Sequence, residues 1–201
     1  IELPTPGKHT LQPKYDRQTN MPSCILCVVR EGWDKSRERF ETWWHGEVID
    51  RPLLQVFAPR KNAPSDPRPE PASPRHRVLD VDYRIKALEW EMAHTYYAGD
   101  AFPYLDTHIG PGTLSLYLGS QPEFHDNTVW YHKCVSDIPS AVPPTFSEHN
   151  AYWQESLRMA REGMDRLRGR ALVSFPDLIE NLDTISSLWG NRELLMALVD
   201  Y

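Results

Sequence analysis

The chain has 201 residues, of which 40% are apolar, 25% charged and 11% aromatic, and its net charge is −6. So many aromatic side chains are typical of a packed globular protein and exclude a disordered one. The acidic balance, without a run of lysine or arginine, argues against a nucleic acid or a membrane surface as partner. The longest apolar run, of about six residues, is far shorter than the roughly 18 residues of a membrane span.

The amino-terminal segment 1–32 contains four prolines and no sustained periodicity, so we expect an irregular leader that need not be native to the domain that follows. Cys24 and Cys27 have zinc or redox spacing, but without a second pair the signal is weak. Three cysteines in all make a disulfide-framed secreted domain improbable and favour a reducing cytoplasm.

Periodicity and turn residues predict the regular elements from residue 33 onward. Helices are expected at 34–45, 81–98, 113–118, 148–168, 178–189 and 191–199. Core strands are expected at 53–57, 101–105 and 172–175, with a smaller strand at 128–131. Between the first strand and the second helix lies a proline-rich loop, 59–74, whose length suits either a binding lid or a solvated linker.

This alternation of helices and strands predicts an α/β fold in which the core strands are parallel and the helices cross over between them. Both a doubly wound sheet and a barrel fit the order. No glycine-rich phosphate-binding motif follows any strand, which weakens the nucleotide-binding variants. Trp43 and Trp44, at the end of the first helix, are both expected to pack in the interior.

Polar side chains follow each predicted core strand, where parallel α/β proteins carry their chemistry. Arg60 follows the first strand, Asp106 and His108 follow the second, and Asp177 follows the third. The arginine could bind a substrate carboxylate, and the aspartate could stabilise positive charge or accept hydrogen bonds. The simpler alternatives are a solvated Arg60, a helix-capping Asp177 and a His108 that only stabilises the adjacent turn.

Several segments from residue 33 to residue 201 together resemble the amino-terminal half of the uroporphyrinogen decarboxylase-like superfamily. The segments are TWWHGEVIDRPLLQVFAPR, YAGDAFPYLDTHIGPGTLSLYLGSQPEF, NTVWYHK and FPDLIENLDTISSLWGNRELLMALVD.

That resemblance implies a partial (β/α)8 TIM barrel, formed by the amino-terminal three to four β/α units, and a cytoplasmic decarboxylase or a methyltransferase. The chain would then be a fragment that is inactive alone. A methyltransferase parent would use zinc, with ligands beyond residue 201, and a corrinoid protein partner; a homodimer is also compatible. Residues 1–201 themselves predict no metal site and no cofactor.

The resemblance also assigns roles at the strand ends. Asp106 matches the aspartate that gathers pyrrole NH groups, and Arg60 matches an arginine that meets substrate carboxylates. With His108 they form the expected catalytic set. Substrate binding is expected from Arg60 and Asp106 together with Gly110, Gly112 and Asp177.

Two departures weaken a tetrapyrrole substrate: Lys61–Ala63 stand where the decarboxylases carry a second arginine, and Ser186 stands near the position of a tyrosine. The competing interpretation is a non-catalytic binding or assembly module. It would use the aromatic-rich face and the proline-rich loop to engage a protein partner.

Overall fold

The computed structural model describes residues 32–136, 141–178 and 181–200, so the predicted leader and its Cys24–Cys27 pair lie outside the described residues. The helices described are α2 (Trp33–Trp44), α3 (Pro74–Leu79), α4 (Val81–His94), α5 (Thr113–Tyr117), α6 (Ala151–Arg166), α7 (Asn181–Trp189) and α8 (Asn191–Asp200). The strands described are β1 (Gln55–Pro59), β2 (Thr95–Gly99), β3 (Tyr104–Leu105), β4 (Gln121–Phe124), β5 (Val129–His132) and β6 (Leu172–Val173).

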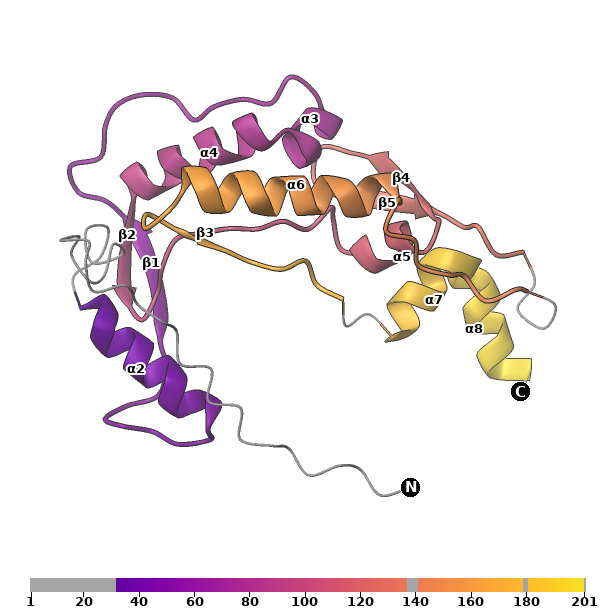
Figure 1. Ribbon diagram of the computed structural model, residues 1–201, viewed down its shortest axis with the longest axis horizontal. Coiled ribbons are helices and arrows are strands. Elements are labelled where there is room, and N and C mark those ends of the chain that lie inside the picture. The colour runs from indigo at the N-terminus through magenta and orange to yellow at the C-terminus, as the bar shows by residue number, and fades with distance from the viewer. Residues whose placement is uncertain (1–31, 137–140, 179–180, 201) are drawn as a thin grey trace.

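Helices α4 and α6 run side by side along the molecule, with α2 and the β1–β2 pair at one end and α7 and α8 at the other (Figure 1). The main hydrophobic core lies between these two helices and the strands beside them. Its buried members are Val81, Ile85, Leu88, Leu105, Met159, Leu167 and Ala171. Residues three and four apart on α4 thus share the inward face that amphipathic spacing predicts.

A second, smaller core surrounds α5. Val78 of α3, Ile109, Leu116, Tyr117 and Val129 of β5 are its buried members. Leu105 belongs to the first core and Ile109 to the second, so the segment 106–108 connects the two cores. Both flanks of this short segment are therefore fixed by buried side chains.

Strands β3 and β6 are parallel neighbours, with Tyr104 opposite Leu172 and Leu105 opposite Val173. The connection between them contains α6, which packs on the pair through Met159 and the flanking core residues. This arrangement confirms the α/β class and the parallel alignment that we predicted for the strands at 101–105 and 172–175. The connection is long because parallel strands require a crossover rather than a tight turn.

The first predicted strand does not join this parallel pair. β1 pairs antiparallel with β2, from Gln55 opposite Gly99 to Pro59 opposite Thr95. The parallel alignment predicted for 53–57 is therefore wrong, and the helix predicted to reach residue 98 ends at His94. The β-branched and aromatic residues at 95–97 favour extended backbone, which outweighed the continuing helical periodicity.

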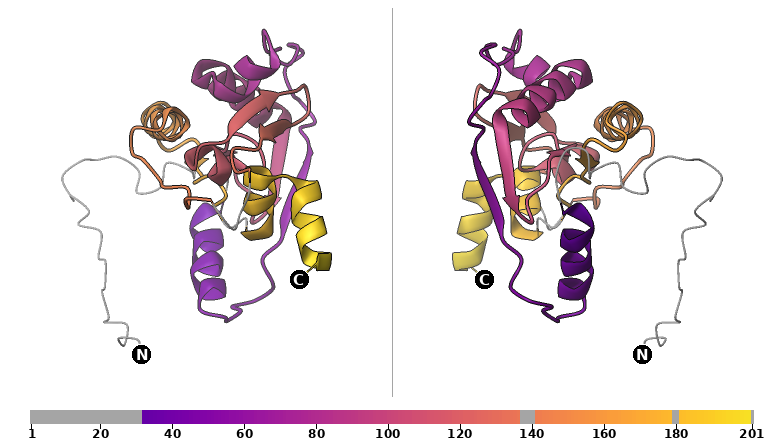
Figure 2. Two further views of the ribbon diagram at one scale, coloured as in Figure 1. Left: turned by 90° about the vertical axis from the view of Figure 1, so that its right-hand side faces the viewer. Right: turned by 90° about the vertical axis from the view of Figure 1, so that its left-hand side faces the viewer.

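The described strands form three separate two-stranded sheets, none of them closed into a barrel. The predicted small strand at 128–131 is confirmed as β5, which pairs antiparallel with β4. Seen from the two ends of the molecule, α3 and α4 lie above and α2, α7 and α8 lie below (Figure 2). No described helix combines the length and the hydropathy that would let it cross a bilayer.

The proline-rich loop 59–74 runs along α4 and is held there by side chains of that helix. The Trp90 indole Nε1 donates to the Asp66 carbonyl at 3.0 Å, and the His94 ring lies 3.0 Å from the Pro64 carbonyl. The guanidinium of Arg68 stacks over the Trp90 ring at 5.9 Å. The loop is thus docked on the protein along much of its length.

Trp43 and Trp44, which we expected in the interior, are 53% and 80% exposed. Their prediction is wrong because the buried face of α2 lies nearer its start, at Trp33 and Ser36. The two indole rings contact each other, with centroids 6.2 Å apart.

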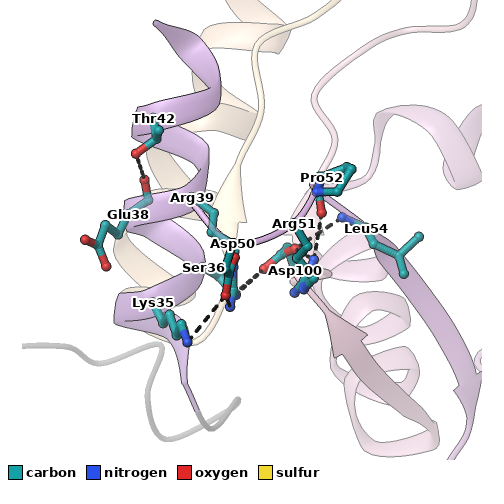
Figure 3. A network of polar contacts seen from close by, with 10 residues as sticks. All are labelled: Lys35, Ser36, Glu38, Arg39, Thr42, Asp50, Arg51, Pro52, Leu54 and Asp100. Atoms are coloured by element: carbon teal, nitrogen blue, oxygen red, sulfur yellow. Dashed lines mark hydrogen bonds and ion pairs between the residues drawn. The ribbon is translucent and has the colours of Figure 1, made fainter. Parts of the chain in front are cut away.

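A buried carboxylate joins α2 to the β1–β2 pair (Figure 3). Asp100 has no exposed surface and accepts hydrogen bonds from Ser36 and Arg39 of α2, at 2.8 and 3.0 Å. Its other oxygen accepts from Arg51 and from the Leu54 amide. Every contact of this carboxylate fastens one structural element to another.

Candidate functional site

The carboxyl ends of the parallel strands β3 and β6 bring together residues that are almost seventy positions apart in the sequence. Asp106 directly follows β3, and Ser174 directly follows β6. The Ser174 hydroxyl donates to Asp106 Oδ1 at 3.4 Å, and the buried Thr107 hydroxyl donates to the Ser174 carbonyl at 2.8 Å. The two strand ends are therefore tied together where parallel α/β proteins place their active sites.

Asp106 and His108 form a hydrogen-bonded pair at this point. The His108 ring nitrogen Nδ1 contacts Asp106 Oδ2, and the His108 amide donates to Asp106 Oδ1 at 3.0 Å. The side chains are 31% and 45% exposed, so the pair is open to a small molecule. A carboxylate that binds Nδ1 fixes the tautomer and orientation of the imidazole and leaves Nε2 for proton transfer.

The pKa of Asp106 lies below its usual value. Burial acts to raise it, but the hydrogen bonds from the His108 ring and amide, with the positive charges of His108 and Arg84, outweigh burial. Asp106 is therefore a carboxylate at neutral pH.

Arg84 of α4 binds the backbone of the loop that carries Asp106 and His108. Its guanidinium donates to three backbone carbonyls, those of Val78 and His108 at 3.0 Å and that of Asp106. Burial, and after it the positive charge of Arg77, lowers the pKa of Arg84, whereas the charge of Asp106 raises it. Arg84 thus holds the backbone on both sides of the Asp106–His108 pair.

Gly110 and Gly112 shape the turn that follows. The Tyr131 hydroxyl of β5 accepts from the Gly112 amide at 2.8 Å and donates to the Ile109 carbonyl at 2.9 Å. A Cβ on Gly112 would lie 2.6 Å from the Tyr131 ring, and one on Gly110 would lie 2.7 Å from the Cβ of Val129. Gly110 also has a φ of 81°, which favours glycine. Both glycines therefore serve the close packing of the loop on β5, apart from any contact with a substrate.

The structure brings Asp106, His108, Gly110 and Gly112 together but places Arg60 elsewhere. The Arg60 guanidinium donates to the Met92 and Thr95 carbonyls at the end of α4, at 3.4 and 3.2 Å. Arg84, which contacts Asp106, is eight residues earlier on the same helix, or roughly 12 Å along its axis. Arg60 and Asp106 therefore contact opposite ends of α4, because β1 left the parallel arrangement on which their predicted convergence depended.

Asp177 is exposed in the segment between β6 and α7, four residues before Asn181 begins that helix. In the β4–β5 hairpin, His125 and His132 both lie beside Glu123, at 3.0 and 3.5 Å. Across the described ranges, no three His, Cys, Asp or Glu side chains gather into a group that could hold a metal ion.

Sequence reasoning missed Arg84, Arg77 and Ser174. Arg84 carried a usable signal, because it shares the helix face of Val81, Ile85 and Leu88, and a charge on a buried face is rarely without a partner. Ser174 could have been found from its place after the third predicted strand. Arg77 lies on α3, a short helix that the sequence pattern did not indicate.

Comparisons of the chain with protein-family models, with curated protein sequences and with solved structures found no match.

Proposed function

We propose that the chain belongs to a barrel enzyme of the uroporphyrinogen decarboxylase-like superfamily and that Asp106 and His108 act on a small anionic substrate. The observation that carries the proposal is the hydrogen-bonded Asp106–His108 pair at the carboxyl end of β3, beside its parallel neighbour β6. Barrel enzymes assemble their active sites from residues in this position.

Exposed apolar surface on the parallel pair supports a barrel as the setting of this site. Tyr104 of β3 and Leu172 of β6 are 48% and 38% exposed, and Phe175, just beyond β6, is 90% exposed. Further strands of a barrel would cover such side chains and would pair with the open edges of a two-stranded sheet. The parallel strands β3 and β6 are joined by a connection that contains α6, as in the strand–helix–strand unit of a barrel, with α5 and the β4–β5 hairpin inserted before α6.

Decarboxylation uses the chemistry of this pair directly. When the bond between carbon and the leaving carboxylate breaks, carbon dioxide departs and the electron pair stays on the carbon, which then takes a proton. His108, whose Nδ1 is held by the Asp106 carboxylate, can deliver that proton from Nε2 when it acts as the general acid. Methyl transfer is the other branch of the proposal and would draw on zinc and a corrinoid protein.

Turnover assays on the complete barrel protein that would contain this chain test this proposal. That protein is incubated with carboxylated reduced tetrapyrroles, with simpler carboxylic acids and with methylcobalamin, and carbon dioxide release and demethylation are measured. Asp106→Asn should lower kcat/KM about 100-fold, which is the usual scale of general acid–base catalysis. His108→Gln should cause a similar loss, because the two residues act as one unit.

Asp165→Asn is the matched control, since Asp165 is exposed on α6, where its carboxylate lies 4.0 Å from Arg168. It should keep full activity. Absence of turnover with every compound of the panel, or equal activity of Asp106→Asn and Asp165→Asn, would contradict the proposal.

The exposed tryptophans favour a second candidate, an assembly function in which two copies of the chain associate through the end of α2. Trp43 and Trp44 adjoin Val48 and Ile49, which are 63% and 45% exposed. Such a patch is typical of protein interfaces. Sedimentation velocity should show a dimer that Trp44→Ser dissociates, whereas a monomer at all concentrations would exclude this function.

A further inference from the structure

A small pocket lies beside the Asp106–His108 pair, on the side of α3 and β5. Its volume is about 160 Å³, and its polar lining consists of Arg77, Arg84, His108, Asn127 and Thr128. Val78, Val129 and the turn at Gly110–Pro111 complete the wall. Because His108 belongs to both, a group bound in the pocket would also meet the candidate acid–base pair.

Neither arginine of this pocket forms an ion pair with a carboxylate of the described residues, although the charge of Asp106 acts on Arg84. Arg84 donates only to backbone carbonyls in the contacts described above, and Arg77 donates to the His125 carbonyl at 3.1 Å. Among the described residues, neither has an Asp or Glu oxygen within the 4.0 Å of an ion pair. Elsewhere in the chain, Arg39 and Arg158 each contact two carboxylates.

A second feature of Arg77 is the state of its Nε donor. Its Nε atom is buried and has no hydrogen-bond partner among the described residues. A buried donor without an acceptor is unfavourable by about 1–3 kcal/mol, and native structures seldom leave one unsatisfied without a reason. The Arg77 side chain also lines the pocket.

We propose that this pocket binds a carboxylate group of a small organic acid, held by Arg77 and Arg84 next to His108. A guanidinium presents paired N–H donors that match the planar carboxylate, and arginine stays charged at every physiological pH. The binding site stands on its own contacts, while the role of the bound acid as substrate rests on the proposed function. It gives that function an anion-binding residue in place of the distant Arg60.

The pocket is tested by titrating the full chain with succinate at constant ionic strength and following the arginine Nε–H signals in ¹H–¹⁵N spectra. One Nε–H resonance should shift and saturate. Arg77→Gln should weaken succinate binding at least tenfold, and Arg77→Lys, which keeps the charge, should lose less. Arg75→Gln should bind like the unaltered chain, because Arg75 lies on the same helix but over the Phe124 ring, outside this pocket.

Shifts that grow linearly without saturation, or equal weakening by Arg75→Gln and Arg77→Gln, would overturn the proposal. Inorganic phosphate is the second arm of the titration; binding as tight as that of succinate would identify a general oxyanion site and overturn the carboxylate assignment. A thermal melt of Arg77→Gln shows whether this variant is folded. If it is not, succinate binding by Arg77→Lys decides the proposal.

Asp106→Asn separates this inference from the proposed function. Removal of a negative charge near the pocket should leave succinate binding intact or strengthen it, whereas the proposed catalysis should fall steeply. Succinate binding that depends on Arg77 in a chain without turnover would refute the function alone. Turnover without that binding would refute the pocket alone.

Discussion

Two aspartates six residues apart in the sequence have opposite surroundings. Asp100 is fully buried and receives hydrogen bonds from two arginines, a serine and a backbone amide (Figure 3). Asp106 is partly exposed, and its hydrogen bonds come from its own loop and from Ser174. Arg77 and Arg84, which lie nearby, donate hydrogen bonds to backbone carbonyls.

This difference separates the structural carboxylate Asp100 from the carboxylate that we propose to be functional. The contacts of Asp100 join the end of β2 to α2 and to the segment that leads into β1, and its side chain is fully buried. Beside Asp106 lie two arginines that form no ion pair among the described residues, a partly exposed imidazole and a pocket. Fully satisfied polar networks make a fold rigid, whereas functional sites keep binding capacity that a substrate completes.

The largest effect is expected from Asp100→Ala. Arg51 would lose its carboxylate partner and the buried donors of Ser36 and the Leu54 amide would lose their acceptor, so the free energy of unfolding should fall by about 3 kcal/mol. Urea denaturation followed by circular dichroism measures the loss. Asp50→Asn is the control, because Asp50 contacts Arg39 at the surface and should matter far less. Equal losses in both variants would remove the distinction between buried and exposed carboxylates here.

Low pH should weaken the hydrogen bonds that the Asp100 carboxylate accepts. Burial acts to raise the pKa of Asp100, but the hydrogen bonds from Arg51, Ser36, the Leu54 amide and Arg39 lower it from 3.8 to about 2. A depressed pKa stabilises the fold above the unfolded value, and that stabilisation disappears as the pH falls from about 4 through about 2. Denaturation curves of the wild type should therefore lose more stability across this window than those of Asp100→Asn. Parallel losses would show that Asp100 does not titrate as proposed.

The Asp106 region was predictable from the sequence to a greater degree than the Asp100 region. Strands at 101–105 and 172–175, the helix between them and the turn after Asp106 all follow from apolar periodicity and glycine placement, which are local signals. The antiparallel pairing of β1 with β2 is a tertiary choice, and residues 95–97 suited a helix end and a strand equally by pattern. The predicted convergence of Arg60 with Asp106 depended on a parallel β1, and it does not occur in the structure.

The loop conformation at Gly110 offers an intermediate effect. Gly110→Ala adds a Cβ that would lie 2.7 Å from Val129, at a φ of 81°. Strain and crowding together should lower the unfolding free energy by about 2 kcal/mol. Gly46→Ala is the matched control, since Gly46 has a φ of 78° and nothing within 4 Å of the added atom. The two variants share the backbone strain, so the difference between their losses of unfolding free energy measures the crowding of the loop against β5. Equal losses would mean that only the backbone strain matters.

The smallest effect on stability is expected from Asp106→Asn, and it bears most directly on the comparison. The carboxamide keeps an oxygen that can accept the hydrogen bond from the His108 amide. The contact that it weakens, between the Asp106 side chain and the His108 ring, is partly exposed to solvent. The unfolding free energy should therefore change by less than about 1 kcal/mol. Urea denaturation of Asp106→Asn and Asp100→Ala in parallel measures both changes. If Asp106→Asn lost as much unfolding free energy as Asp100→Ala, Asp106 would be a structural carboxylate like Asp100. Its contact with His108 would then be explained by stability and would no longer support a catalytic role for His108. A small loss would show that the fold does not need the Asp106 charge, as expected of a carboxylate that serves the proposed function.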